Sequence, residues 1–144
     1  MNTPNINIAS EEAFLVSGGA RGITAQCVIK LAQRYRQIGY KNCKFVLVGR
    51  SHYTGEQIPV WATDIGQVDK PTTEAALKSS AAAHLASSGE RPTPKRIQRM
   101  VKDALAQCEI AATLQAIEDA GGKAVYVSAD VTDEAALRTG VAEA

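Results

Sequence analysis

The chain has 144 residues, of which 45% are hydrophobic and 22% charged, and its formal net charge is +1. This length and composition suit one globular domain, and the near-zero net charge argues against a large basic surface for nucleic acid. The first ten residues lack the features of a signal peptide, and no apolar run approaches the ~18 residues that span a bilayer, so a cytoplasmic location is expected.

The start of the sequence predicts a strand, a helix and a second strand. Residues 13–17 form a short apolar run that ends at glycines, as in a buried strand. From Ile23 to Tyr35, apolar residues recur three and four positions apart, which predicts an amphipathic helix that stops near Gly39. Residues 44–49 (KFVLVG) contain four consecutive apolar residues, typical of a strand covered on both faces. This unit favours parallel pairing through a right-handed crossover.

The middle of the sequence predicts a helical insert. Residues 51–70 contain Gly, Pro, Trp and scattered polar residues, and they are interpreted as a loop. Residues 72–88 are rich in alanine, which predicts a helix with Thr72 as its N-cap. The segment RPTPKR predicts the start of another helix, with Thr93 as its N-cap, that continues to about residue 120.

The last part of the sequence predicts a third strand and a final helix. Residues 123–128 (KAVYVS) alternate and are rich in β-branched residues, which indicates a strand. The chain then turns at Asp130 and enters a helix, for which Thr132 is the expected N-cap. The expected fold class is therefore α/β, a partial Rossmann-type doubly wound parallel sheet of three strands. A helical insert, about residues 51–96, lies between strands 2 and 3.

The segment SGGARGIT lies between the first strand and the first helix. Gly18 and Gly19 permit positive φ angles and a close approach of the backbone to a ligand. The helix that starts near Gly22 directs its unpaired N–H groups into the same space, and Arg21 adds a positive charge, so a pyrophosphate would be accommodated. A tight turn without any ligand also explains the stretch. Its spacing departs from GxGxxG, since Thr24 stands where another glycine would be expected.

Two polar residues follow the second and third predicted strands. Arg50 occupies the position where dinucleotide-binding folds often have an acidic residue for the ribose 2′-hydroxyl, so its guanidinium favours a 2′-phosphate and NADP(H) over NAD(H). Asp130 could accept a hydrogen bond from an adenine amino group, and Val131 could pack on the ring. A solvated arginine and a helix-capping aspartate are the alternatives. These features share the carboxyl ends of consecutive strands, where ligands bind in open α/β sheets.

The segments SGGARGIT, LVGRS and SADVTD, in this order, resemble the short-chain dehydrogenase/reductase family. They are most similar to ketoreductase domains of type I polyketide synthases and bacterial polyunsaturated fatty acid synthases, which carry a segment like RPTPKRI at the same place. The resemblance covers the chain from about Phe14 onward. It implies that NADP(H) is bound by Ser17, Gly18, Gly19, Ala20, Arg21, Gly22 and Ile23 at the pyrophosphate, Arg50 and Ser51 at the 2′-phosphate, and Asp130 and Val131 at the adenine.

The resemblance also implies an activity and partners. Such domains use NADPH to reduce a β-ketoacyl thioester on acyl carrier protein to the β-hydroxyacyl thioester, beside the other domains of the synthase. The family's catalytic serine, tyrosine and lysine follow a fourth strand, for which this sequence has no counterpart. Residues 1–144 are therefore expected to be the N-terminal, cofactor-binding part of one reductase domain and to be inactive alone. Tyr40 and Lys44 have the family's spacing, but they precede the second strand and are rejected.

More than one class of function stays open. The chain is either part of an NADPH-dependent oxidoreductase or a non-catalytic structural half-reductase that acts as a scaffold or interaction module; nothing in the sequence speaks specifically for a stand-alone nucleotide sensor. No metal site is expected, because His52, His84 and the three cysteines are scattered. No catalytic residue, nucleic acid or membrane partner is expected either. An unpaired sheet edge would favour a homodimer.

Overall fold

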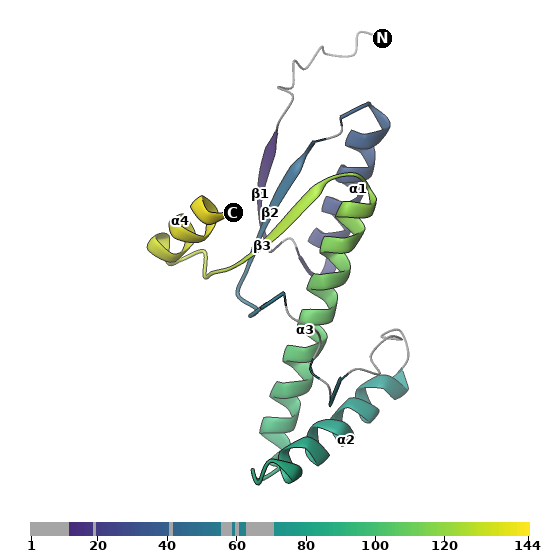
Figure 1. Cartoon of the computed structure of the whole chain (residues 1–144), viewed down its shortest axis with the longest axis vertical. Helices are drawn as coiled ribbons and strands as arrows, with labels where there is room; N and C mark the ends of the chain where they lie inside the picture. The colour runs from purple at the N-terminus through teal and green to yellow at the C-terminus, as the bar shows by residue number, and fades with distance from the viewer. Residues whose placement is uncertain (1–11, 19, 41, 56–58, 60, 63–70) are drawn as a thin grey trace. The chain divides into compact units, whose positions relative to one another are not determined.

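The computed structural model describes residues 12–18, 20–40, 42–55, 59, 61–62 and 71–144. Their elements follow the order β1–α1–β2–α2–α3–β3–α4 (Figure 1). The chain divides into two compact units. We call Met1–Arg50 with Ala112–Ala144 the sheet unit, and Ser51–Ala111 the insert unit. Within the described ranges, no helix is both long enough and apolar enough to cross a membrane.

The sheet is parallel, with the strand order β1-β2-β3. Its strands are β1 (Ala13–Ser17), β2 (Lys44–Gly49) and β3 (Lys123–Ser128). The central strand β2 has a neighbour on each side, and its Phe45 and Leu47 are fully buried, as its continuous apolar run predicted. The α/β class, the three parallel strands and their bounds are thus confirmed.

Helix α1 (Gly22–Gln37) and the end of α3 (Pro94–Asp119) lie on one face of this sheet. Phe14 of β1 has its ring centroid 5.4 Å from that of Tyr35 on α1 and 5.3 Å from that of Phe45. A methyl group at Gly122 would touch both Ile117 of α3 and Phe45. In addition, Arg36 of α1 donates a hydrogen bond of 2.9 Å to the Asp119 carbonyl oxygen, which joins the two helices.

Helix α4 (Glu134–Glu143) packs on the opposite face of the sheet (Figure 1). Its Leu137 and Val141 contact the cluster formed by Val46, Val48 and Val127. Because side chains alternate along a strand, these valines point away from the face that carries Phe45 and Leu47. The sheet is therefore covered by α1 and α3 on one side and by α4 on the other.

The predicted helix caps had mixed outcomes. Thr93 is confirmed for α3, since its hydroxyl oxygen accepts a hydrogen bond of 3.4 Å from the Arg96 N–H. Thr72 is wrong, because α2 (Pro71–Ser87) begins one residue earlier. Thr132 is also wrong: the N-cap of α4 is Asp133, whose carboxylate accepts a hydrogen bond from the Ala136 N–H at 3.1 Å. The Thr132 hydroxyl is instead engaged with the carboxylate of Asp130.

The insert unit is built around α2 and residues 94–111 of α3. Its core consists largely of small side chains, and Trp61 packs against it. The buried members of this core are Ala62, Leu77, Ala81, Val101 and Ala104. Most of the predicted loop at residues 51–70 lies outside the described residues.

Candidate functional site

The carboxyl ends of the three strands meet at one edge of the sheet (Figure 1). Hydrogen bonds extend the strand pairing by one residue beyond β1 and β3. The Gly18 N–H donates to the Val48 carbonyl at 2.7 Å, and the Ala129 N–H donates to the Gly49 carbonyl at 2.9 Å. These bonds hold the segments that follow the strands side by side. We call this region the carboxyl edge: residues 17–18 and 20–23 after β1, 49–51 at the end of β2, and 128–131 at the end of β3.

The turn after β1 depends on the backbone freedom of glycine. Gly18 has φ +66° and Gly22 has φ +62°, in the left-handed region that side chains strongly disfavour. A Cβ atom at either position would meet no atom within 4 Å, so the backbone angle, and not crowding, requires glycine there. The positive φ expected at Gly18 is therefore confirmed, whereas Gly19 lies outside the described residues.

A buried hydrogen bond anchors the middle of this turn. The hydroxyl of Thr113 on α3 donates to the Ala20 carbonyl oxygen at 2.9 Å, and both residues are buried. Sequence analysis missed Thr113. The available signal was a hydroxyl on the helix face that also carries Ile110 and Ile117, since a buried hydroxyl in such a position needs a partner. Thr113 therefore couples the position of the turn to α3.

The start of α1 is suited to a negatively charged group. Arg21 is its N-cap, with φ −143° and ψ 155°, but no side chain caps the helix by a hydrogen bond. The first turn of α1, which is described throughout, contains no acidic residue. The first N–H groups and the positive end of the helix dipole are thus left for an anion. Ile23, in this first turn, is 85% exposed.

Asp130 follows β3 and carries a stabilised negative charge. The N–H and the hydroxyl of Thr132 donate to its Oδ1 atom at 2.9 and 2.8 Å, respectively. These two hydrogen bonds hold the pKa of Asp130 below its ordinary value, and the nearby Arg50 guanidinium lowers this pKa further by a smaller amount. Arg50 and Asp130 therefore lie close enough to interact electrostatically across the ends of β2 and β3.

Tyr126 is a further residue of this edge that sequence analysis missed. A Cβ atom at Gly49 would lie 2.6 Å from the Tyr126 hydroxyl oxygen. The tyrosine side chain therefore reaches across the end of β2, and the absence of a side chain at Gly49 makes room for it. The only signal in the sequence was a tyrosine within an otherwise aliphatic strand. At Asp130, the expected alternative of a helix cap does not apply, since Asp133 is the cap of α4.

The carboxyl edge brings together the described residues that were predicted to bind a cofactor. Arg50 and Val131 are exposed there, Val131 by 54%, and Ser51 is half-buried. The full set is Ser17 at the end of β1, Gly18, Ala20 and Arg21 in the turn, Gly22 and Ile23 at the start of α1, Arg50 and Ser51 after β2, and Asp130 and Val131 after β3. Lys44 is instead the first residue of β2, at the opposite edge, as its rejection as a catalytic residue assumed.

The fold and its carboxyl edge define an α/β protein with a parallel sheet and a glycine-containing strand-to-helix turn. Comparison with known proteins gives one informative relative. The chain is 37% identical over 141 residues to a polyunsaturated fatty acid synthase polypeptide of Thraustochytrium sp.. The alignment covers 98% of this chain but only 5% of the synthase polypeptide, so the chain is homologous to a short part of it. No family model matches the chain, and no solved structure matches it.

Proposed function

We propose that this chain is the NADP(H)-binding part of a β-ketoacyl reductase domain. The observation that carries the proposal is the carboxyl edge, where the glycine turn, the start of α1, Arg50 and Asp130 meet. Similarity to a fatty acid synthase polypeptide supports a place in a multidomain synthase. In such a synthase, the complete domain would reduce a β-ketoacyl thioester on acyl carrier protein, with NADPH as the hydride donor.

The residues at this edge fit the parts of the cofactor. The positive φ angles of Gly18 and Gly22 and the uncapped start of α1 suit a pyrophosphate. Arg50 is exposed and can bind a 2′-phosphate through charge-assisted hydrogen bonds. The ionised carboxylate of Asp130 can accept from an adenine amino group, and the exposed Val131 offers an apolar surface to the ring. Bound NADPH would supply the hydride, while these residues would hold and orient it.

The path of the chain also supports a dinucleotide site at β1. Helices α1 and α3 lie on one face as the chain passes from β1 to β2 to β3, whereas α4 lies on the other face. Because crossovers are right-handed, a parallel strand that follows α4 would add beside β1. The strand order would then reverse next to the glycine turn, and ligands bind at such switch points. Leu15 of β1, which is 58% exposed, would be covered by that addition.

Calorimetric titration of the 144-residue chain with NADPH and NADH tests this proposal. Saturable binding with a preference for NADPH is expected. Arg50→Ala should weaken NADPH binding by about tenfold or more, the usual effect of losing a hydrogen bond to a charged group, and leave NADH binding nearly unchanged. Arg91→Ala, which removes an exposed arginine of the insert unit, is the matched control and should bind like the unmodified chain. An unchanged NADPH preference in Arg50→Ala would contradict the role of Arg50.

NADPH oxidation and nucleotide binding by the same chain distinguish a part of an enzyme from a scaffold. The chain alone is expected not to oxidise NADPH in the presence of a β-ketoacyl thioester, because residues 1–144 have no counterpart of the family's catalytic serine, tyrosine and lysine. Steady turnover by the pure chain would contradict this. If neither the folded chain nor a preparation supplemented with the rest of the domain binds a nucleotide, the scaffold function is favoured instead.

A further inference from the structure

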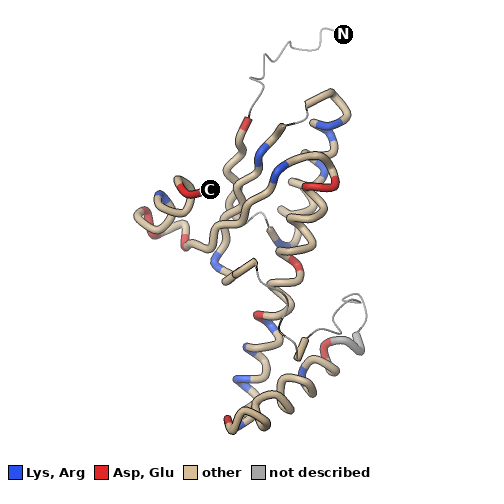
Figure 2. Tube along the Cα trace, viewed as in Figure 1, with Lys and Arg blue, Asp and Glu red and all other residues tan. Residues whose placement is uncertain are grey.

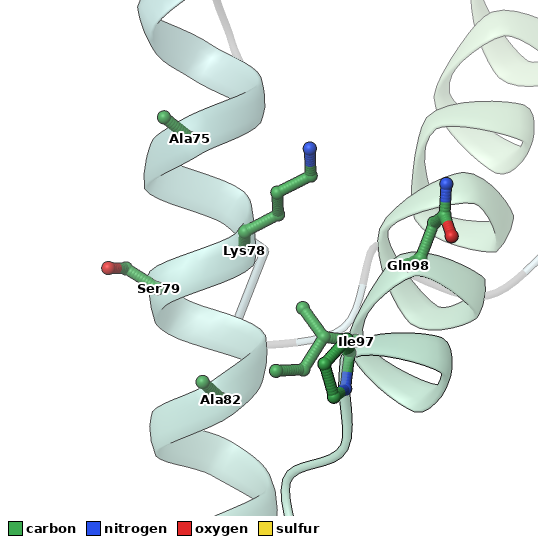
Figure 3. Close-up of a pocket in the computed structure, with 7 residues that line it drawn as sticks. Ala75, Lys78, Ser79, Ala82, Ile97 and Gln98 are labelled. Atoms are coloured by element: carbon green, nitrogen blue, oxygen red, sulfur yellow. The ribbon is translucent and has the colours of Figure 1, made fainter.

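A mainly apolar groove of about 590 Å³ lies between α2 and α3 in the insert unit (Figure 3). Ala75 and Ala82 line it from α2, and Pro94 and Ile97 line it from α3. Figure 3 shows Ile97 and Lys78 extending into the space between the two helices. None of the residues that line the groove belongs to the carboxyl edge.

The groove follows from the size of the side chains on α2. This helix uses Leu77, Ala81 and Leu85 for its buried face, so its larger apolar side chains are committed to the core. Ala75 and Ala82 lie beside that face and leave space above Ile97. The two alanines are seven residues apart, about 10 Å along a helix axis. That spacing matches two successive apolar side chains on one face of a partner helix.

A basic stripe runs along α3 beside the groove. It consists of Lys95, Arg99 and Lys102, spaced four and three residues apart and all exposed. Figure 2 shows in blue that basic positions recur along the first part of α3. Gln98, which lines the groove, lies three residues after Lys95 and four before Lys102, so the stripe borders the groove.

Two acidic residues near the groove pair with basic residues outside this stripe. Glu74 pairs with Lys78 at 2.9 Å and Glu90 pairs with Arg96 at 2.8 Å. Within the described part of the chain, no ion pair includes a member of the basic stripe. The groove thus combines an apolar floor with a positive border whose three members form no ion pair among the described residues.

We propose that this groove binds an amphipathic helix with an acidic face, supplied by another protein chain or domain. Apolar side chains of that helix, two turns apart, would enter the groove over Ile97, and its carboxylates would pair with the basic stripe. Helices α1 and α4 of a second copy are poor occupants, because α1 contains no acidic residue and α4 pairs its Glu134 with Arg138 at 2.7 Å.

The test uses two fluorescent peptides and the whole 144-residue chain. The first is an amphipathic helix of about 18 residues, or five turns, with leucines on one face and glutamates beside them. The second has lysine in place of every glutamate. In fluorescence anisotropy, the acidic peptide should bind saturably, bind about tenfold or more tightly than the basic one, and lose affinity as salt rises. Equal binding of both peptides would overturn the proposal.

Two variants and one control locate the binding surface. Arg99→Glu combined with Lys102→Glu should weaken binding of the acidic peptide by about tenfold or more, because two attractive charges become repulsive. Ala82→Leu should also weaken binding of this peptide, without any change of charge, since the added side chain occupies the groove. Lys30→Glu combined with Arg34→Glu makes the same charge change on exposed positions of α1 and should have little effect.

Three results would overturn the assignment of this surface. The first is equal weakening by the Lys30/Arg34 control, which would indicate a long-range effect of net charge only. The second is a concentration-dependent dimer in sedimentation that disappears in the Arg99/Lys102 variant, which would make a second copy the occupant. The third is binding to phosphatidylserine vesicles that is stronger than binding to the acidic peptide and is lost in the same variant. Circular dichroism of each variant verifies that the helices remain folded.

Discussion

The two units of this chain bury apolar surface in different ways. In the sheet unit, the fully buried side chains include Phe45, Leu47 and Ile117, which are large. Among the described residues of the insert unit, four of the eight buried hydrophobic side chains are alanines, and Ile110 is the large side chain that is fully buried. Burial contributes roughly 25 cal/mol per Å² of apolar surface, so a buried phenylalanine or leucine contributes more than a buried alanine. Four of the five largest fully buried side chains therefore lie in the sheet unit, which is expected to contain the most costly single truncations.

The candidate sites of the two units also differ in what determines their geometry. At the carboxyl edge, the geometry depends on backbone features: the φ angles of Gly18 and Gly22 and the hydrogen bonds beyond the strand ends. In the groove of the insert unit, it depends on side chains displayed by two helices. Substitutions can therefore change the groove without unfolding it, whereas substitutions of Gly18 or Gly22 are expected to alter both stability and binding.

Truncation of one core residue in each unit tests the first comparison and should give the largest effects. Phe45→Ala is expected to lower the free energy of unfolding by about 3–5 kcal/mol, because its ring is fully buried. Leu77→Ala in the insert unit should cost less, about 2–3 kcal/mol, near the lower end for such truncations. Urea unfolding followed by circular dichroism measures both. A greater loss from Leu77→Ala would contradict the expected order of the two truncations.

Thr113→Val tests how far the carboxyl edge depends on a single buried bond. Valine has nearly the same shape, but it leaves the Ala20 carbonyl without its 2.9 Å hydrogen bond. The expected loss is about 1–3 kcal/mol, the usual effect of an unsatisfied buried polar group. Thr139→Val, at an exposed position, is the matched control and should change stability by no more than about 0.5 kcal/mol. Faster amide exchange at residues 20–22 should accompany only the first variant.

The strands and the general location of the candidate site could be predicted from the sequence. Residues 44–49 contain four consecutive apolar residues because β2 is covered on both faces, and a short run of this kind is typical of a buried parallel strand. The site followed from topology, since parallel strands end at the same edge and Arg50 and Asp130 each come directly after a strand. The strands were predicted from residues that are adjacent in the sequence. The site was predicted from the rule that all strands of a parallel sheet end at the same edge.

The features that could not be predicted depend on contacts between distant segments. Thr113 and Ala20 are 93 residues apart, so their bond has no local signal. The Tyr126 side chain crosses Gly49 on a neighbouring strand, which requires the strand register to be known. The cap of α4 was missed for a local reason: Thr132 could bond either to α4 or to Asp130, and the structure shows the second. Such competition between polar side chains cannot be resolved from residue preferences alone.

Removal of one N-cap in each unit should change the free energy of unfolding by less than the core truncations do. Asp133→Ala should lower the free energy of unfolding by about 1 kcal/mol, because the 3.1 Å bond to the Ala136 N–H is lost at the positive end of α4. Thr93→Ala should cost less, within the range of about 0.5–2 kcal/mol known for caps, because its bond is longer at 3.4 Å and its side chain is uncharged. Thermal unfolding of both variants checks the order, and a larger cost for Thr93→Ala would contradict it.

The titration of Asp130 should contribute the smallest change in stability. It tests the electrostatics of the carboxyl edge. Its pKa is lower in the folded chain than in the unfolded one, so its hydrogen bonds stabilise the fold fully above the unfolded pKa of about 3.9. That contribution is lost as the pH falls through the folded pKa. Carboxyl NMR should detect a higher pKa in Thr132→Val, which loses the 2.8 Å hydroxyl bond, and no change in Thr139→Val. Arg50→Ala should raise this pKa by less. A larger rise in Arg50→Ala would mean that the guanidinium is engaged mainly with Asp130, which would weaken its assignment to a phosphate.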